Sequence, residues 1–371
     1  MYKKLVICVA FATLIFSQKL LIADCNPCPQ QCCMNPSDRC YLENRFDISA
    51  SFLWWKAEQP DLPCSFVNTD PNPDNGQNFG FIDYINFGWK PGFRVEGCWE
   101  TNYDGWNLST NYTWMENESH AHSGKMTNPE VGLFTQLSDF RGDHPPYPIF
   151  DTDVGTFTTV TFNLGLGTAS AKWKMQYNMF DLQLGKPYLV SPKLALTPFI
   201  GGLGGWIKRD LKIIYSNEPF SDSSWHQHFI SNYWGVGPRL GFNSDWKIGS
   251  GFEFFGNFAS ALLFGSNYGE KALCSVFVGA EPLVSRLQAD LYRKHGKTRI
   301  VPAIQMMIGL GWNDCFNWNC HDYYIDLSAA WEVNYYWNFQ NFLNNQAIQA
   351  AYVHPTSLEL GGLTASATVG F

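Results

Sequence analysis

The chain has 371 residues, a net charge of −8, 16% aromatic residues and 16% charged residues. Charged residues are scarce compared with the roughly 25% of ordinary soluble domains, and no basic block suggests a nucleic-acid partner. After the first 23 residues, no segment approaches the length of about eighteen apolar residues that a spanning helix needs. A membrane-spanning form of this chain would therefore be a closed barrel, because only helices and closed barrels satisfy every backbone polar group in lipid.

The amino-terminal segment is predicted to be a targeting signal. Lys3 and Lys4 precede an apolar run over residues 5–16, and Ala23 suits the last position before cleavage. We therefore expect residues 1–23 to be a signal peptide and residues 24–45 to be a cysteine-rich periplasmic segment. Residues 46–371 would then form a single transmembrane barrel.

The cysteines are predicted to form disulfides, because the chain is expected to be exported. Cys315 and Cys320 flank a short turn. Zinc is the alternative for the amino-terminal cysteines, but zinc would need a second pair at a defined distance. We expect no cofactor and no metal. The remaining disulfide candidates are Cys25, Cys28, Cys32, Cys33 and Cys40.

Alternation of apolar and polar residues recurs along the chain and predicts ten strands. The first nine cover approximately residues 46–54, 87–95, 106–114, 173–179, 194–206, 234–242, 252–264, 300–310 and 323–333. The tenth strand covers residues 358–371 and carries Leu363 and Val369 on its apolar face. An amphipathic last strand ending in Phe is typical of bacterial outer-membrane barrels. Phe371 is therefore predicted to be a membrane-insertion signal.

The connections between these strands alternate between short and long. The short ones lie at residues 98–104, 181–193, 244–250 and 313–321. Outer-membrane barrels combine short periplasmic turns with long external loops, and tryptophans near strand ends fit their interfacial girdles. These patterns predict an all-β, transmembrane antiparallel up-and-down β-barrel in the bacterial outer membrane. We expect at least ten strands, within a range of 10–16.

Four segments carry a resemblance to a known family. They are residues 51–59 (SFLWWKAEQ), 89–108 (WKPGFRVEGCWETNYDGWNL), 180–209 (FDLQLGKPYLVSPKLALTPFIGGLGGWIKR) and 234–265 (WGVGPRLGFNSDWKIGSGFEFFGNFASALLFG). The chain resembles the pore-forming major outer membrane protein family of Legionella and of the environmental relatives of chlamydiae. The resemblance implies a β-barrel porin without catalytic residues. The cysteine-rich amino terminus also resembles chlamydial-type envelopes, in which disulfide-linked proteins stiffen the wall.

A pore would be lined by the charged residues that alternate with the apolar face, because rings of charge set ion preference. Their signs are mixed, which predicts weak selectivity. The alternative for each residue is a structural role, in which its side chain interacts with other side chains and stabilises the barrel wall. A barrel of only ten strands could also be filled by side chains. The predicted lumen-lining residues are Lys90, Arg94, Glu96, Lys172, Lys174, Arg239, Glu253, Asp326 and Glu332.

We therefore predict a porin that allows passive diffusion of small hydrophilic solutes or ions and strengthens a disulfide-linked envelope. The alternative is a surface adhesin or structural barrel without an open pore. Expected partners are outer-membrane lipid, the barrel-assembly machinery, other envelope proteins through disulfides, and further copies of the chain. A host receptor could bind the tripeptide Arg141-Gly142-Asp143 in an external loop. An enzyme is not expected, although His226, His228 and Asp222 in a predicted loop could activate water.

Overall fold

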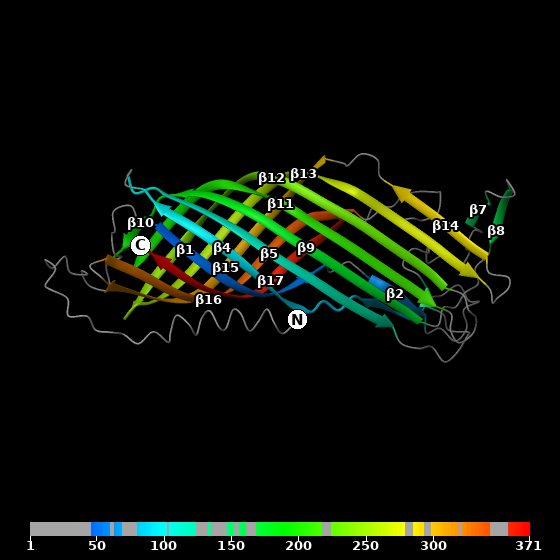
Figure 1. Ribbon diagram of the computed structural model, residues 1–371, viewed down its shortest axis with the longest axis horizontal. Coiled ribbons are helices and arrows are strands. Elements are labelled where there is room, and N and C mark those ends of the chain that lie inside the picture. Colours follow the sequence, from blue (N-terminus) through cyan, green and yellow to red (C-terminus); the bar gives the residue numbers. More distant parts are fainter. Residues whose placement is uncertain are drawn as a thin grey trace.

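Ten β-strands form a closed wall in this computed structural model of the chain (Figure 1). In ring order they are β1, β4, β5, β9, β11, β12, β13, β15, β16 and β17, and β17 pairs with β1 to close the ring. All of these pairings are antiparallel. The predicted all-β barrel is confirmed, at the lower limit of the expected strand count. The structure describes residues 46–59, 63–68, 80–101, 104–123, 133–134, 147–151, 156–160, 168–216, 224–278, 285–292, 298–318, 321–341 and 355–371.

Five of the wall strands are far longer than a membrane requires. Strands β11, β12, β13, β15 and β16 contain 21 to 27 residues. A tilted strand of about ten residues crosses a bilayer, so these strands continue beyond it. The bounds of the wall strands are β1 Phe46–Glu58, β4 Trp89–Glu100, β5 Asn107–Ser123, β9 Thr168–Gly185, β11 Leu194–Ser216, β12 Ser224–Gly249, β13 Phe252–Val278, β15 Thr298–Trp318, β16 His321–Asn341 and β17 Pro355–Gly370.

Shorter strands accompany the wall within the described part of the chain. Strands β10 and β14 pair with β11 and β13 respectively. Figure 1 shows β10 and the carboxyl terminus near one end of the molecule, and β2 and β14 toward the other end. None of the residues described here forms a helix long and apolar enough to cross a membrane. The bounds of the shorter strands are β2 Pro63–Asn68, β3 Gly80–Tyr84, β6 Leu133–Phe134, β7 Tyr147–Asp151, β8 Thr156–Val160, β10 Tyr188–Ser191 and β14 Ser285–Tyr292.

The connections alternate in length as the sequence predicts. The turn between β12 and β13 consists of Ser250 and Gly251, with φ of 53° and 80°, as two-residue hairpin turns require. Two connections predicted to be long, at residues 209–231 and 265–299, are shorter in the structure. Strands β11 and β12 continue through most of residues 209–231, and β13 extends to Val278. The reason is that these segments keep a two-residue alternation and form additional wall above the membrane.

The apolar face of the wall changes sides along the strands. In β9, Phe180 is 51% exposed, whereas Trp173 is fully buried. In β17, Leu363 is 43% exposed, whereas Leu358 is fully buried. Successive residues of a strand point to opposite faces, so the exposed residues lie outside and the buried ones inside. The wall therefore has two parts: a membrane zone with an apolar outer face, and an external zone with a mainly apolar interior that also holds buried polar residues such as Arg209 and Glu270.

Aromatic residues mark the boundary between the two zones on the outer face. On β11, Trp206 is 43% exposed and the next outward residue is Lys208. On β12, Trp234 is 49% exposed and pairs directly with Trp206. Tryptophan is enriched at membrane interfaces, so these residues form the external girdle of the barrel. The short turns lie at the opposite end, which is the periplasmic end by the usual rule for such barrels.

The interior of the external zone is a packed core. Tyr233 of β12 contacts Phe339 of β16, with ring centroids 5.0 Å apart. Phe87 contacts Trp173 of β9, also at 5.0 Å. Trp173 donates a hydrogen bond to the Gln59 side chain across 2.9 Å. The Tyr233–Phe339 contact joins strands that are not neighbours in the ring, and Phe87 and Gln59 come from the segments next to β4 and β1. Side chains therefore fill the space inside the external zone.

Replacing Trp173 with alanine should destabilise the barrel by about 3–5 kcal/mol, because it empties a buried aromatic site in this core. Urea unfolding of the refolded protein in lipid vesicles would measure the change. Trp246→Ala is the control, because Trp246 is 58% exposed on the outer face. Equal losses in the two variants would contradict the existence of a packed external core.

Candidate functional site: a charged layer inside the barrel

A layer of polar and charged side chains crosses the interior on the membrane side of the external core. Its main ion pair joins Arg94 of β4 to Glu332 of β16, with N···O distances of 2.7 and 3.0 Å. Two strands, β17 and β1, separate these partners in the ring. The pair is bidentate, which gives such contacts both strength and a fixed geometry. We call Arg94, Asp181, Arg239, Gln305 and Glu332 the charged layer.

The Glu332 carboxylate is surrounded by donors. Besides Arg94, it accepts hydrogen bonds from Gln305 at 2.5 Å, Asn334 at 3.1 Å and Thr364 at 3.2 Å. Glu332 itself is fully buried. Burial of a carboxylate is costly unless it is paired and hydrogen-bonded, and this carboxylate meets that requirement.

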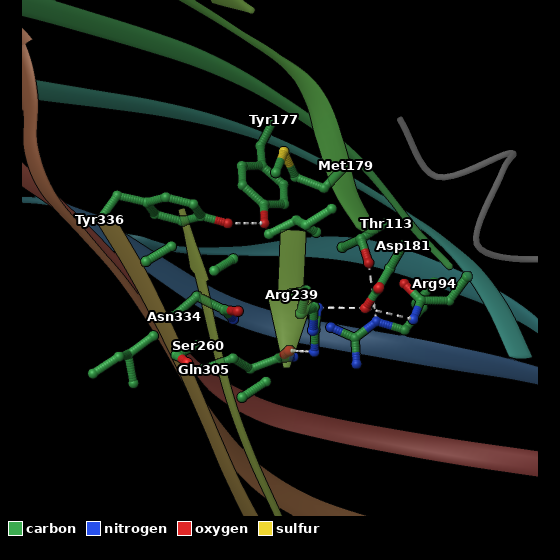
Figure 2. Close-up of a pocket in the computed structure, with 16 residues that line it drawn as sticks. Arg94, Thr113, Tyr177, Met179, Asp181, Arg239, Ser260, Gln305, Asn334 and Tyr336 are labelled. Atoms are coloured by element: carbon green, nitrogen blue, oxygen red, sulfur yellow. Dashed lines mark hydrogen bonds and ion pairs between the residues drawn. The ribbon is translucent and has the colours of Figure 1, made fainter. Parts of the chain in front are cut away.

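A second ion pair completes the charged layer. Arg239 of β12 contacts Asp181 of β9 and also donates to the Gln305 side chain. Gln305 in turn donates to Glu332, so one continuous network links the two ion pairs. Figure 2 shows Arg94, Asp181 and Arg239 converging from different strands. The arrangement places two positive and two negative side chains across the interior, where each positive charge lies beside a negative one.

Two tyrosines lie next to the charged layer, on its external side. The hydroxyl groups of Tyr177 on β9 and Tyr336 on β16 are 2.6 Å apart (Figure 2). These strands are five positions apart in the ten-strand ring, so the contact joins opposite walls. Both side chains are buried, at 3% and 2% exposure. The tyrosine pair therefore narrows the interior further.

A small cavity remains beside the layer. Its volume is about 30 Å³, and it is lined by residues that include Arg94, Asp181, Arg239 and Tyr177. A cavity needs roughly 10–15 Å³ for each water molecule, so this one holds about two. The cavity itself is therefore large enough for water and too small for a larger solute.

Several other predicted lumen residues lie on the inner face, either beside this layer or nearer to the periplasmic end. Glu96 and Lys90 share the inner face of β4 with Arg94, because they are two and four residues away from it. Glu253 and Asp326 lie toward the periplasmic end, where both approach Gly311 of β15. Their part in solute passage stays a prediction.

The predicted position of Lys172 and Lys174 in the lumen is wrong. Both side chains contact Glu118 on the outer surface, at 2.5 and 3.2 Å, and are 41% and 47% exposed. The buried Trp173 between them faces the interior. The physical reason is that water surrounds the external zone, so its apolar residues turn inward. Hydrogen bonds from Lys172 and Lys174 lower the pKa of Glu118 to about 2.

The histidines also lie elsewhere than predicted. His226 and His228 belong to strand β12 and not to a loop. The His228 ring lies 3.1 Å from Asp210, on the outer face beside Lys208 and Lys212. Asp222, the third residue of the water-activation hypothesis, lies outside the described residues.

The remaining predicted sites are partly beyond the described chain. Cys315 is disulfide-bonded, but its predicted partner Cys320 lies outside the described residues. Phe371 packs against Phe46, with ring centroids 5.7 Å apart, and its role in insertion stays a prediction. Two further groups also lie outside the described residues: the cysteines of residues 24–45, and Arg141-Gly142-Asp143.

The sequence analysis missed four residues of the site, namely Asp181, Gln305, Tyr177 and Tyr336. Asp181 lies between Phe180 and Leu182, both exposed to the outside, so the alternation places it inside. Tyr177 and Tyr336 belong to the external core, where the inner face is apolar. Along β9 the apolar residues change from odd-numbered to even-numbered positions after Met179. This change was the signal in the sequence that the inner face becomes apolar.

The membrane zone and its polar interior define the chain as an outer-membrane β-barrel protein. A family model described as Legionella pneumophila major outer membrane protein precursor matches residues 40–369. The chain therefore belongs to this family, and its location is the bacterial outer membrane. No curated protein matches it.

Solved outer-membrane barrels show remote similarity. The protease OmpT from Escherichia coli is 9% identical, with 89% of this chain and 98% of that chain covered and a TM-score of 0.37. A Pseudomonas aeruginosa FadL homologue is 6% identical, with coverages of 89% and 90% and a TM-score of 0.28. The P. putida toluene transporter TodX is 7% identical, with coverages of 88% and 89% and a TM-score of 0.26. Similarity at this level transfers no activity or substrate.

Replacing Glu332 with glutamine should destabilise the barrel by about 3–5 kcal/mol, because it leaves the buried Arg94 without its counter-charge. Urea unfolding in lipid vesicles would measure the change. Glu359→Gln is the control, because Glu359 lies on the outer face of β17. The double variant Arg94→Met/Glu332→Met should lose less unfolding free energy than the sum of the losses in Arg94→Met and Glu332→Met. Additive losses would contradict coupling between the pair.

Proposed function

We propose that this protein is a porin of low conductance, through which water, ions and small hydrophilic solutes diffuse passively. The polar inner face of the membrane zone carries this proposal. Ser49, Ser51, Ser366 and Thr368 point inward there, on strands whose outer faces are apolar. Polar side chains on the inner face are compatible with water inside the membrane zone, as a porin requires. Membership of a family of major outer membrane proteins supports the same proposal.

The charged layer would be the constriction of this porin. Its two ion pairs have no excess charge, so we infer weak preference between cations and anions. The small cavity beside Arg94 and Asp181 gives water a position within the layer. Larger solutes would require the tyrosine pair above the layer to separate.

A closed structural barrel is the second candidate, and the packed external core favours it. Ten strands enclose a narrow interior that side chains can fill. Trp55, Trp173, Tyr215 and Phe339 are all fully buried in the external zone. In this case the protein would stiffen the envelope. Disulfides from the cysteine-rich segment could link it to other envelope proteins, and the external loops could bind a partner.

Single-channel conductance in a planar bilayer tests the two candidates. Discrete, stable current steps from the refolded protein would support the porin. A silent bilayer with verified insertion would support the closed barrel. A change of conductance or assembly on adding reductant would link the cysteines to either role.

Replacing both Tyr177 and Tyr336 with alanine should raise the conductance, because it removes the contact that joins opposite walls on the external side of the charged layer. Tyr335→Ala is the matched control, since Tyr335 lies on the same strand with its side chain on the opposite face. Conductance would be recorded for variants that refold to the same barrel. Identical currents in all variants would show that the tyrosine pair does not limit passage.

A further inference from the structure

A row of basic residues crosses four neighbouring strands on the outer face of the external zone. His120 of β5 pairs directly with Lys172 of β9. Lys172 pairs directly with Lys212 of β11, and Lys212 with His228 of β12. We call these four residues the basic row. Like charges directly opposite each other destabilise a sheet, so the Lys172–Lys212 pairing needs a compensating anion.

The protein supplies only part of this compensation. Glu118 bonds to Lys172 and Lys174, and Asp210 contacts His228. Both carboxylates lie one row closer to the membrane than the basic row, at the register positions of Lys174 and Asp210. Among the described residues, Lys208 and Lys212 form no ion pair. The lysines of β9 and β11 therefore present positive charge that the neighbouring carboxylates do not neutralise completely.

The height of these lysines above the membrane suits lipid head groups. Lys208 lies two residues beyond Trp206 of the external girdle, and Lys212 lies six residues beyond it. At about 3.4 Å per residue and a tilt of about 40°, these distances are roughly 5 and 15 Å above the girdle. Phosphates and acidic sugars of an outer-leaflet glycolipid occupy this layer of the interface.

We propose that the outer face of β9 and β11 binds a phosphorylated glycolipid of the outer leaflet. The acyl chains would lie against the apolar outer face below Trp206, and the lysines would contact the head-group phosphates. Clusters of basic residues beside a membrane surface recognise anionic lipid in this way. Glu118 positions Lys172 and Lys174 toward the same surface. This site is independent of the barrel interior, so it exists whether or not the barrel conducts.

Binding of deep-rough lipopolysaccharide to the refolded full-length chain in neutral detergent tests the proposal. The dissociation constant would be measured by titration for Lys212→Gln and for the double variant Lys208→Gln/Lys212→Gln. Each basic residue near an anionic surface contributes roughly a fivefold change in affinity, so we expect about fivefold and about thirtyfold weaker binding. Lys193→Gln is the matched control, because Lys193 lies in the turn before β11 at the periplasmic end.

Three results would overturn the proposal. These are unchanged affinity in the variants, equal binding of lipopolysaccharide from which the phosphates have been removed, and equal loss in Lys193→Gln. Inorganic phosphate, added at the same phosphate concentration, should not displace the glycolipid. Displacement would show that the lysines bind a free anion, and it would also overturn the proposal. If the double variant fails to refold, Lys212→Gln alone decides, because it breaks no described ion pair.

Discussion

The solvent outside the wall decides which face of each strand is apolar, and the rest of the structure depends on this. Where lipid surrounds the barrel, the outer face is apolar and the interior can be polar. Where water surrounds it, apolar side chains are stabilised inside. In β9 the change occurs between the exposed Phe180 and the buried Trp173. Because ten strands enclose little space, the same change fills the external zone with side chains.

The charged layer belongs to the junction of these two zones. On its external side the interior contains mainly aromatic and aliphatic residues such as Tyr177 and Tyr336. On its periplasmic side polar residues such as Ser51 and Ser366 lie inside together with Phe199. Arg94 and Glu332 lie where water is scarce, and so they need partners for every donor and acceptor. Arg239 and Asp181 form the second ion pair on the other side of the barrel, where Arg239 Nε and Asp181 Oδ1 are buried without a hydrogen-bond partner among the described residues. The layer is thus the polar end of the external core.

The two-residue alternation predicted all ten wall strands and the alternating connections, because each depends only on local sequence. It placed Lys172 and Lys174 on the wrong face, since the face that lies inside depends on the solvent around the wall. The phase of β9 contained the missing information: apolar residues occupy odd positions up to Met179 and even positions from Phe180 onward. The Arg94–Glu332 pair could not be predicted, because its partners are 238 residues apart and not on adjacent strands.

A closed interior and a channel function are compatible only if the obstacle can move at modest cost. Separating Arg94 from Glu332 is expensive, because each charge would be left buried and unpaired. Separating Tyr177 from Tyr336 breaks one neutral hydrogen bond, which contributes only about 0.5–1.5 kcal/mol net. An open state would therefore keep the ion pairs intact and move the tyrosines. The charged layer would then line the passage as a fixed rim, and the tyrosine pair would act as its gate.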